Sequence, residues 1–437
     1  MKVMLIAGAR PNFMKVAPIV EAIQNFRCEG EETLELVLVH TGQHYDEKMS
    51  KTFFKDLGIP EPAINLEVGS GSHAAQTAEI MKRFEPVLLQ ERPDAVVVVG
   101  DVNSTIACSL VAAKVTYPHD GSWKGIDRPL LVHVESGLRS NDWSMPEEVN
   151  RVLTDRLADL LFVTEESGKR NLLAEGIPKK RIHIVGNTMV DTLLRHRKHA
   201  LESTILRRLG LQSSDESGAV NGSSGQRPVS SKPAAAIPPY ALVTLHRPGN
   251  VDHPETFKGI VDGLIQVVHD MPVIFPIHPR TVGRIKEYGF GSCFRILGDS
   301  QPVSDEKGIL HCIEPLGYLD FLCLMSHARL VLTDSGGIQE ETTALGVPCI
   351  TLRNNTERPV TITCGTNRLV GTNPQKIVRA ARMSLKKKTN SSRTPPLWDG
   401  KAAQRIVSVL VKHLRALNKG TSVQAQRKAK VPTAMAA

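Results

Sequence analysis

Residues 328–348 read ARLVLTDSGGIQEETTALGVP. The apolar, β-branched run up to Thr333 predicts a buried strand, and Asp334-Ser335-Gly336-Gly337 interrupts it. Helical periodicity follows from Ile338, with Gly346 as the C-cap and a proline soon after it as the stop signal. A strand, a glycine turn and a helix make one unit of an α/β fold, and the N–H groups that open such a helix favour an anion.

The turn and the helix carry residues suited to a ligand. Gly336 and Gly337 allow a ligand to approach the backbone, while Glu340 and Glu341, expected in the first helical turn, offer carboxylates to sugar hydroxyls. Arg358, after the next predicted strand, offers a cation to the same end of the sheet. The alternative interpretation is an ordinary βα turn with acids near the helix start, since glycine turns are common in α/β proteins.

Composition bounds the class of protein. A chain of 437 residues with 41% apolar side chains is long enough for two or three domains. Aromatic residues make up only 4% of the chain, which argues against a base-stacking surface. Much of the net charge of +9 lies in Lys386–Lys388 and in the tail from Lys419, so we expect no nucleic-acid partner. The remaining charge is compatible with a small polyanionic ligand.

The cysteines and the apolar runs indicate the compartment. The seven cysteines are scattered without a Cys-x-x-Cys pair, which predicts a reducing, cytoplasmic environment and no zinc or other metal site. Val3–Ala9 is too short for a signal segment, and no run approaches membrane-spanning length. The single Gly8 after the first strand is not the glycine triad of a dinucleotide fold, so we expect no cofactor.

Polar residues follow a series of predicted parallel strands. These strands are residues 3–7, 34–39, 95–99, 130–134 and 160–164. The polar residues after them are Arg10, His40, His44, Asp101 and Glu135. Because the ligand crevice of an open α/β sheet lies at the carboxyl ends of its strands, we interpret these residues as one site. Taken singly, each of them fits a helix cap or a loop residue.

A predicted helix that opens at Pro146 carries a further charged pair. Glu147 and Arg151 are four residues apart and so share one helical face. The functional interpretation is a carboxylate held by its arginine. The alternative is a surface ion pair that contributes less than about 1 kcal/mol.

The chain then changes composition. Residues 213–239 are rich in Ser, Gly, Pro and Ala, which predicts a disordered insertion. A second α/β half starts at Tyr240, has His246 at the end of its first strand, and includes the stretch quoted above. A C-terminal helix is expected at about 401–417.

Together these motifs resemble those of the non-hydrolysing UDP-N-acetylglucosamine 2-epimerases. The resemblance runs in order from about residue 1 to 375, without the insertion, and rests on Gly8–Lys15, Thr41–Asp46, Gly100-Asp101, His133–Arg139, Pro146–Arg151, Leu245–Arg247, Thr333–Glu341 and Thr356–Pro359. It implies an α/β fold of two facing Rossmann-like, doubly wound domains, similar to glycosyltransferase-B enzymes, with the active site in the interdomain cleft. The implied N-terminal domain is 1–184 with a C-terminal helix at about 400–417. The implied UDP-binding domain is 185–399, and 418–437 is expected to be a disordered basic tail.

The resemblance also assigns roles to individual residues. The implied catalytic residues are Asp101, Glu135, Glu147, Arg151 and His246. The implied substrate-binding residues are Arg10, Lys15, His44, Leu316, Phe321, Ser335, Gly336, Gly337, Glu341 and Arg358. In this assignment the first four catalytic residues line the sugar, and His246 lies near the phosphates. Arg10, Lys15 and Arg358 face the diphosphate, the Ser335 turn binds phosphate, Glu341 binds ribose, and Leu316 and Phe321 frame uracil.

The implied activity is interconversion of UDP-N-acetylglucosamine and UDP-N-acetylmannosamine, a UDP-N-acetylhexosamine substrate pair, by elimination of UDP to 2-acetamidoglucal and re-addition. The resemblance further implies a homodimer, a cytoplasmic location and a role in supplying polysaccharide biosynthesis. Three alternatives stay open here: a hydrolysing epimerase, an epimerase of a related diacetamido-uronic acid nucleotide, and a glycosyltransferase of the same fold.

Deletion of Ser214 to Ala236 is expected to leave folding and turnover nearly unchanged, because changing the length of a long surface loop costs little closure entropy. Thermal unfolding and turnover of the deletion variant, compared with the full chain, test this expectation. A large fall in melting temperature would show instead that the segment packs against the protein.

Overall fold

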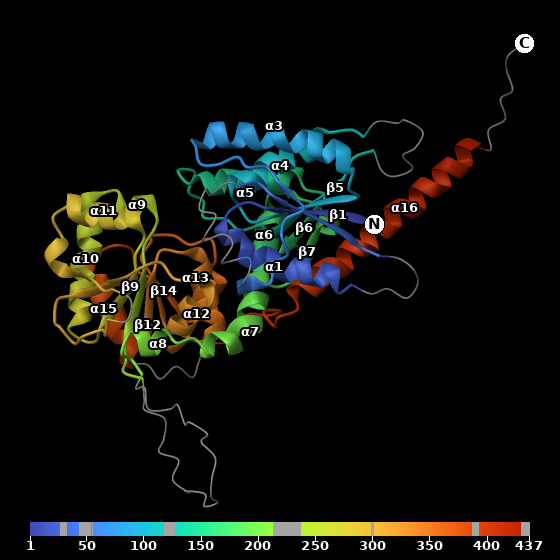
Figure 1. The fold of residues 1–437 in the computed structure, drawn as a ribbon. Coiled ribbons are helices and arrows are strands. Elements are labelled where there is room, and N and C mark those ends of the chain that lie inside the picture. The colour runs from blue at the N-terminus through green and yellow to red at the C-terminus, as the bar shows by residue number, and fades with distance from the viewer. Residues whose placement is uncertain are drawn as a thin grey trace, which may run out of the picture. The chain divides into compact units, whose positions relative to one another are not determined.

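The computed structural model describes residues 1–26, 33–42, 54, 56–117, 127–212, 237–298, 301–386 and 393–429, and of residues 10, 11 and 418–429 the backbone alone. The chain forms two compact units (Figure 1). Unit 1 comprises Met1–Arg195 with Pro395–Ala437, and unit 2 comprises His196–Thr394. In each unit the described strands form one parallel seven-stranded sheet, so the predicted α/β, doubly wound fold is confirmed.

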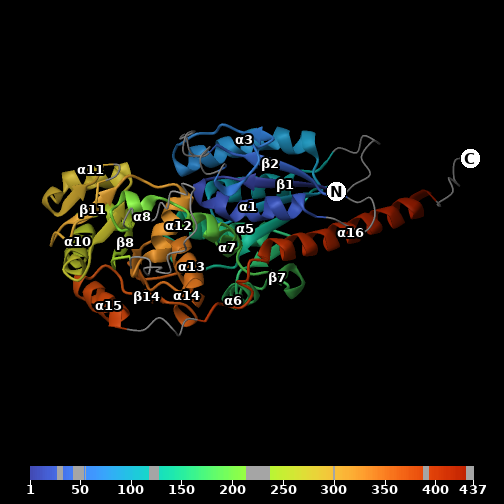
Figure 2. The ribbon, with the colours of Figure 1, turned by 60° about the horizontal axis from the view of Figure 1, so that its bottom comes forward.

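Unit 1 has the strand order β3-β2-β1-β4-β5-β6-β7. The strands are β1 (Lys2–Ala7), β2 (Glu35–His40), β3 (Ile64–Asn65), β4 (Ala95–Val99), β5 (Leu130–Ser136), β6 (Leu160–Val163) and β7 (Ile182–Ile184). The helices are α1 (Arg10–Gln24), α3 (His73–Glu91), α4 (Asn103–Lys114), α5 (Pro146–Leu157), α6 (Glu166–Ala174), α7 (Thr188–Leu201) and α16 (Ala402–Ala429), with a 3-10 turn at Lys179–Arg181. Helices α3, α4 and α5 lie on one face of the sheet, and α1 and α16 lie side by side on the other (Figures 1 and 2).

Unit 2 has the strand order β10-β11-β9-β8-β12-β13-β14, which differs from that of unit 1 because β11 lies between β9 and β10. The strands are β8 (Ala241–Thr244), β9 (Val273–Pro276), β10 (Phe294–Ile296), β11 (Leu310–Ile313), β12 (Leu330–Thr333), β13 (Cys349–Thr351) and β14 (Asn367–Leu369). The helices are α8 (Ile205–Arg208), α9 (Pro248–Val251), α10 (Pro254–Val268), α11 (Pro279–Glu287), α12 (Tyr318–His327), α13 (Gly336–Leu345), α14 (Val360–Thr363) and α15 (Pro374–Lys386), with a 3-10 turn at Gly291–Cys293.

The central strands of both sheets are apolar because helices cover both faces. Every residue of β4, a run of one alanine and four valines, is buried. In unit 2, β12 is likewise buried throughout, and Leu330 and Leu332 join the core formed with α10 and α15. Each sheet therefore holds its connecting loops at fixed positions along the carboxyl ends of its strands.

The C-terminal segment belongs to unit 1. The buried carboxylate of Asp191 on α7 accepts hydrogen bonds from the N–H groups of Ala402 (3.1 Å) and Ala403 (2.8 Å), which open α16. These bonds attach most of α7 to unit 1, so the boundary between the two units falls after Arg195. The sequence analysis placed this domain boundary after residue 184. Helix α16 continues to Ala429, beyond the end expected from the sequence, and residues 213–236 of the predicted insertion 213–239 lie outside the described residues.

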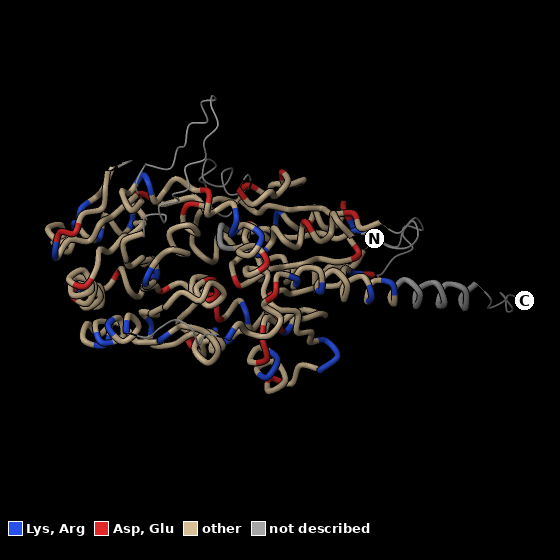
Figure 3. Tube along the Cα trace, turned by 90° about the horizontal axis from the view of Figure 1, so that it is seen from below, with Lys and Arg blue, Asp and Glu red and all other residues tan. Residues whose placement is uncertain are grey.

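Three general findings bear on the class of protein. Within the described ranges, no helix is long and apolar enough to cross a membrane. Lys and Arg are interspersed with Asp and Glu along the described chain (Figure 3). The cysteines that the structure describes are all free thiols.

Replacement of Gly186 by alanine should destabilise unit 1 strongly. Gly186 has a φ of +93°, and a Cβ there would overlap the carbonyl oxygen of Leu397. Gly176 is the matched control, because its φ is +78° but a Cβ would meet nothing within 4 Å. We expect Gly176→Ala to cost about 1 kcal/mol from backbone strain alone, and Gly186→Ala roughly 1–3 kcal/mol more from the overlap. Equal free energies of unfolding for the two variants would contradict this account.

Candidate functional site

Several of the side chains predicted from the sequence lie near the point where each sheet reverses its order. In unit 1 this point lies between β1 and β4, and in unit 2 between β8 and β12. Loops leave the adjacent strands toward opposite faces there, which opens a crevice at the carboxyl ends. Unit 1 and unit 2 each carry a set of these side chains.

A buried ion pair forms the floor of the site in unit 1. Lys15 on α1 pairs through Nζ with Oε2 of Glu135 at the end of β5, and both side chains are buried. Gly100, with a φ of +70°, lies against this pair: a Cβ there would stand 3.1 Å from Glu135 Oε2 and 3.4 Å from Lys15 Nζ. Glycine is therefore required at position 100 both for its backbone conformation and for the close approach of the ion pair.

Asn12 fixes the start of α1 beside that pair. Its Oδ1 accepts the N–H of Ala9 at 3.2 Å, and its Nδ2 donates to the carbonyl of Val99 at 2.8 Å. The side chain thus joins the loop after β1 to the end of β4. The sequence analysis assigned Asn12 no role. Its position shortly after the predicted strand 3–7, beside Arg10, was a signal that it lies at the strand ends.

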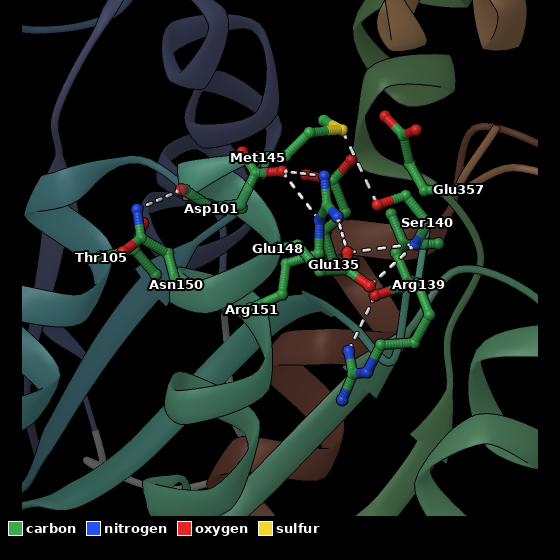
Figure 4. A network of polar contacts seen from close by, with 12 residues as sticks. Asp101, Thr105, Glu135, Arg139, Ser140, Met145, Glu148, Asn150, Arg151 and Glu357 are labelled. Atoms are coloured by element: carbon green, nitrogen blue, oxygen red, sulfur yellow. Dashed lines mark hydrogen bonds and ion pairs between the residues drawn. The ribbon is translucent and has the colours of Figure 1, made fainter. Parts of the chain in front are cut away.

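The second charged group of unit 1 is centred on Arg151 (Figure 4). Its Nε donates to Oδ2 of Asp101 at 2.9 Å, and its Nη1 pairs with Glu148 three residues earlier on α5. Arg151 is only 1% exposed, whereas the side chain of Asp101 is 22% exposed. The guanidinium is thus held in place inside the unit and presents the Asp101 carboxylate at the surface of the site.

Glu148 is a site residue that sequence reasoning missed. Its carboxylate accepts the N–H groups of Ser140 (3.0 Å) and Asn141 (2.8 Å) and so fixes the loop between β5 and α5 (Figure 4). The sequence analysis chose Glu147 because it lies four residues before Arg151. Glu148 lies three residues before Arg151, and this spacing also places two side chains on one helical face. Glu147 lies half-buried in the first turn of α5, next to Glu148.

In unit 2 a buried aspartate organises the turn after β8. Asp334, fully buried, accepts the N–H groups of His246 (3.1 Å) and Arg247 (3.0 Å) and the Nδ2 of Asn250 (3.1 Å). Its Oδ1 also lies 2.9 Å from Nδ1 of His246. Burial alone would raise the pKa of Asp334, but the His246 ring and the backbone donors outweigh it and lower that pKa. The imidazole of His246 is thereby anchored by one edge and remains 56% exposed.

The buried side chain of Arg358 lies against the glycine turn Ser335-Gly336-Gly337. Arg358 reaches Oε1 of Glu340 with its Nε at 2.9 Å and Oε1 of Glu357 with its Nη1 at 2.6 Å. A Cβ at Gly336 would overlap the Arg358 guanidinium, so only glycine fits at the start of α13. Helix α13 begins at Gly336, not at Ile338, with Ser335 as its N-cap.

The early start of α13 corrects one expectation. Glu340 and Glu341 lie in the second turn and not the first, and both are buried. Oε1 of Glu341 accepts the hydroxyl of Tyr318 on α12 at 3.1 Å. Burial, reinforced by the neighbouring Glu340, raises the pKa of Glu341 to about 8 against the lowering effect of that hydrogen bond. Leu316 and Phe321 lie on either side of Tyr318, both half-buried.

The remaining predicted positions are placed as follows. Ser335 and Gly337 are half-buried at the start of α13. The backbone of Arg10 opens α1, and His44 lies outside the described residues. Within the described part of the chain, no group of His, Cys, Asp and Glu has the arrangement of a metal site. Unit 1 thus holds cations paired with carboxylates that could exchange protons, and unit 2 holds a buried arginine beside a helix start, which is suited to an anion.

Comparison with known proteins gives consistent matches. A family model described as UDP-N-acetylglucosamine 2-epimerase matches residues 27–411. A relative from Methanocaldococcus jannaschii named UDP-N-acetylglucosamine 2-epimerase is 41% identical over 414 residues, covering 94% of this chain and 99% of the relative. A crystal structure of that organism's enzyme in complex with UDP-GlcNAc and UDP matches 94% of this chain and all of that chain, with a TM-score of 0.76. A Pseudomonas aeruginosa relative named UDP-2,3-diacetamido-2,3-dideoxy-D-glucuronate 2-epimerase is 36% identical over 415 residues, covering 94% of this chain and 100% of the relative.

Replacement of Glu341 by glutamine should change how stability depends on pH. Because the pKa of Glu341 is about 8 in the folded protein and ordinary in the unfolded chain, the folded state holds a proton that the unfolded state releases as the pH rises from about 5 to 8. Stability of the wild type should therefore fall across this window by up to a few kcal/mol from this group. Glu341→Gln should lack that contribution in chemical denaturation at pH 5 and pH 8. The same pH trend in both proteins would show that Glu341 ionises normally.

Proposed function

The chain belongs to the UDP-N-acetylglucosamine 2-epimerase family, and from this premise we propose that this isomerase interconverts UDP-N-acetylglucosamine and UDP-N-acetylmannosamine. The resemblance predicted from the sequence is thereby confirmed. The observation that carries the proposal is the pairing of buried cations with the carboxylates of Glu135 and Asp101 at the carboxyl ends of β4 and β5.

The chemistry of the substrate explains why carboxylates are needed. C2 of an N-acetylhexosamine is not next to a carbonyl group, so its proton is too weakly acidic for direct removal. We propose that UDP leaves from C1 while a carboxylate takes the proton from C2, which gives 2-acetamidoglucal. UDP then adds back to C1 as a proton returns to C2 on the opposite face. One C–O and one C–H bond break and form again, so no redox partner is required.

Unit 1 is proposed to handle the proton. Asp101, Glu135 and Glu147 supply the acid and base groups, and Arg151 orients Asp101. Lys15 pairs with Glu135 and is proposed also to stabilise the negative charge of the leaving diphosphate. Arg10 is proposed to face the same diphosphate.

Unit 2 is proposed to bind UDP. The start of α13 at Ser335, Gly336 and Gly337 is proposed to bind phosphate through the first N–H groups of the helix, and Arg358 adds a fixed positive charge beside them. The exposed His246 is proposed to approach the diphosphate, since Asp334 holds its other edge. Glu341 is assigned to the ribose, Leu316 and Phe321 to uracil, and His44 to substrate binding.

A second candidate substrate rests on a specific relative. The Pseudomonas aeruginosa protein named UDP-2,3-diacetamido-2,3-dideoxy-D-glucuronate 2-epimerase is 36% identical to this chain. The same elimination would serve that sugar, because the reacting C1 and C2 atoms carry the same groups. Comparison of kcat/KM for the two nucleotide sugars separates these candidates.

The direct test is incubation with UDP-N-acetylglucosamine alone, followed by separation of the sugar products. UDP-N-acetylmannosamine formed without loss of UDP supports the proposal. Release of UDP with free N-acetylmannosamine would indicate a hydrolysing enzyme instead. Absence of turnover until an acceptor is added would indicate a glycosyltransferase.

Replacement of Asp101, Glu135 or Glu147 by the corresponding amide should lower kcat by about two to four orders of magnitude, the usual contribution of a positioned acid or base. UDP affinity, measured by calorimetry, should change far less, because the residues assigned to uracil and ribose belong to unit 2. Glu79→Gln is the control, since this carboxylate forms an exposed ion pair with Arg83 on α3. Equal loss of UDP binding in all three variants would mean that these residues have a structural role.

The homodimer and the cytoplasmic location stay predictions. Mass photometry of the purified protein tests the first, with a mass of twice 47.8 kDa as the expected result. Fractionation of cells that express the protein tests the second.

A further inference from the structure

A second buried pair lies behind the proposed catalytic carboxylates of unit 1. His133 on β5 is 0% exposed and Asp155 on α5 is 1% exposed. His133 Nδ1 lies 2.6 Å from Asp155 Oδ1, and His133 Nε2 lies 2.8 Å from the carbonyl oxygen of Gly100. Neither side chain is among the residues proposed to contact the substrate.

The partners of this pair determine where its protons lie. The Gly100 carbonyl can only accept, so Nε2 of His133 carries a hydrogen. Asp155 accepts the N–H of Gly137 at 3.0 Å and pairs with Arg139 at 2.8 Å, both through Oδ2. Burial would raise the pKa of Asp155, but His133 and Arg139 lower it below its ordinary value. Asp155 is thus an acceptor on both oxygens, and Nδ1 of His133 donates to it.

Asp155 fixes the backbone on both sides of Glu135. His133 precedes Glu135 by two residues and Gly137 follows it by two, and the same carboxylate binds both. Glu135 itself has a φ of +69°, a left-handed conformation that costs a residue with a side chain about 1 kcal/mol or more. The pairing of β5 with β6 is irregular at this point, between Val134 and Ser136. Asp155 therefore holds the irregular backbone that aims Glu135 at Lys15.

His133 also fixes the backbone at the end of the neighbouring strand β4. The Gly100 carbonyl that it binds belongs to the residue directly before Asp101. Gly100 also lies against the Glu135 carboxylate, since a Cβ at position 100 would stand only 3.1 Å from Oε2 of Glu135. One buried His–Asp pair thus fixes the two backbone segments that carry Glu135 and Asp101.

We propose that Asp155 and His133 are positioning residues of the epimerisation. They act through the backbone of Glu135 and Gly100 and hold the carboxylates of Glu135 and Asp101 in fixed positions. This inference rests on the proposed function. It predicts that loss of the pair misplaces the proton-transferring groups, while the UDP-binding residues of unit 2 are unaffected.

The test uses the full chain with Asp155→Asn and, as a second variant, His133→Gln, which retains a donor for the Gly100 carbonyl. Each should lower kcat by about 100-fold, since small misplacement of reacting groups has that effect, with KM for UDP-N-acetylglucosamine and the Kd of UDP nearly unchanged. Asp191→Asn is the matched control, because Asp191 is also a buried carboxylate of unit 1 that accepts two backbone N–H groups. It should lower stability without lowering kcat per folded molecule.

A double-mutant cycle separates positioning from a general structural role. If Asp155 acts through Glu135, Asp155→Asn should cost little further activity in the Glu135→Gln background. Additive losses, or kcat per folded molecule equal to the wild type in both single variants, would overturn the inference. If Asp155→Asn fails to fold, the same cycle with His133→Gln decides. Lack of epimerase activity in the wild type would instead refute the proposed function itself.

Discussion

The order of the parallel strands is the constraint on which the rest of the structure depends. In each unit the order reverses beside the first strand, β1 in unit 1 and β8 in unit 2. Loops from adjacent strands then diverge and leave a crevice at the carboxyl ends. Lys15 and Gly100 occupy this position in unit 1, and His246 and Asp334 occupy it in unit 2. The same reversal of strand order thus gives one unit an ion pair beside carboxylates and the other an anchored histidine beside a helix start.

Burial of charge gives these sites their rigidity. A buried ion is costly unless its partners and hydrogen bonds compensate for the lost water, and each one here has such partners. Arg151 is held by Asp101 and Glu148, and Arg358 by Glu340 and Glu357. Removal of one partner would leave the other charge buried and uncompensated, so these groups keep a single geometry. That fixed geometry is what electrostatic stabilisation of a leaving diphosphate requires.

Local sequence predicted those parts of the fold that depend on local pattern. The valine run of β4 and the apolar run of β12 form buried strands as expected, and Gly346 ends α13 in the left-handed conformation expected of a C-cap. The motifs also led to Lys15, Asp101 and Glu135, which the structure brings to adjacent strand ends. The start of α13 was misjudged because glycine has a low helix propensity, whereas Gly336 is helical here to make room for Arg358.

The partners of the site residues could not be predicted because they depend on tertiary packing. Glu148 and Glu147 are adjacent acids on one helix, and the pairing of Glu148 with Arg151 inside the unit depends on how α5 packs against the sheet. Asp155 meets His133 across 22 residues of sequence, and Asp334 meets His246 across 88. No spacing rule links such pairs. The extent of α7 in unit 1 likewise depends on a contact between Asp191 and the distant start of α16.

The central claim is that the carboxylates of unit 1 remove and return the hydrogen at C2. The most direct measurement is epimerisation of UDP-N-acetylglucosamine in deuterium oxide, with the isotope at C2 of the product read by NMR or mass spectrometry. A carboxylic acid that exchanges with solvent should deliver deuterium to C2 of the product, and to recovered substrate after prolonged incubation. Product that retains only protium at C2 after long incubation would contradict proton transfer by these carboxylates.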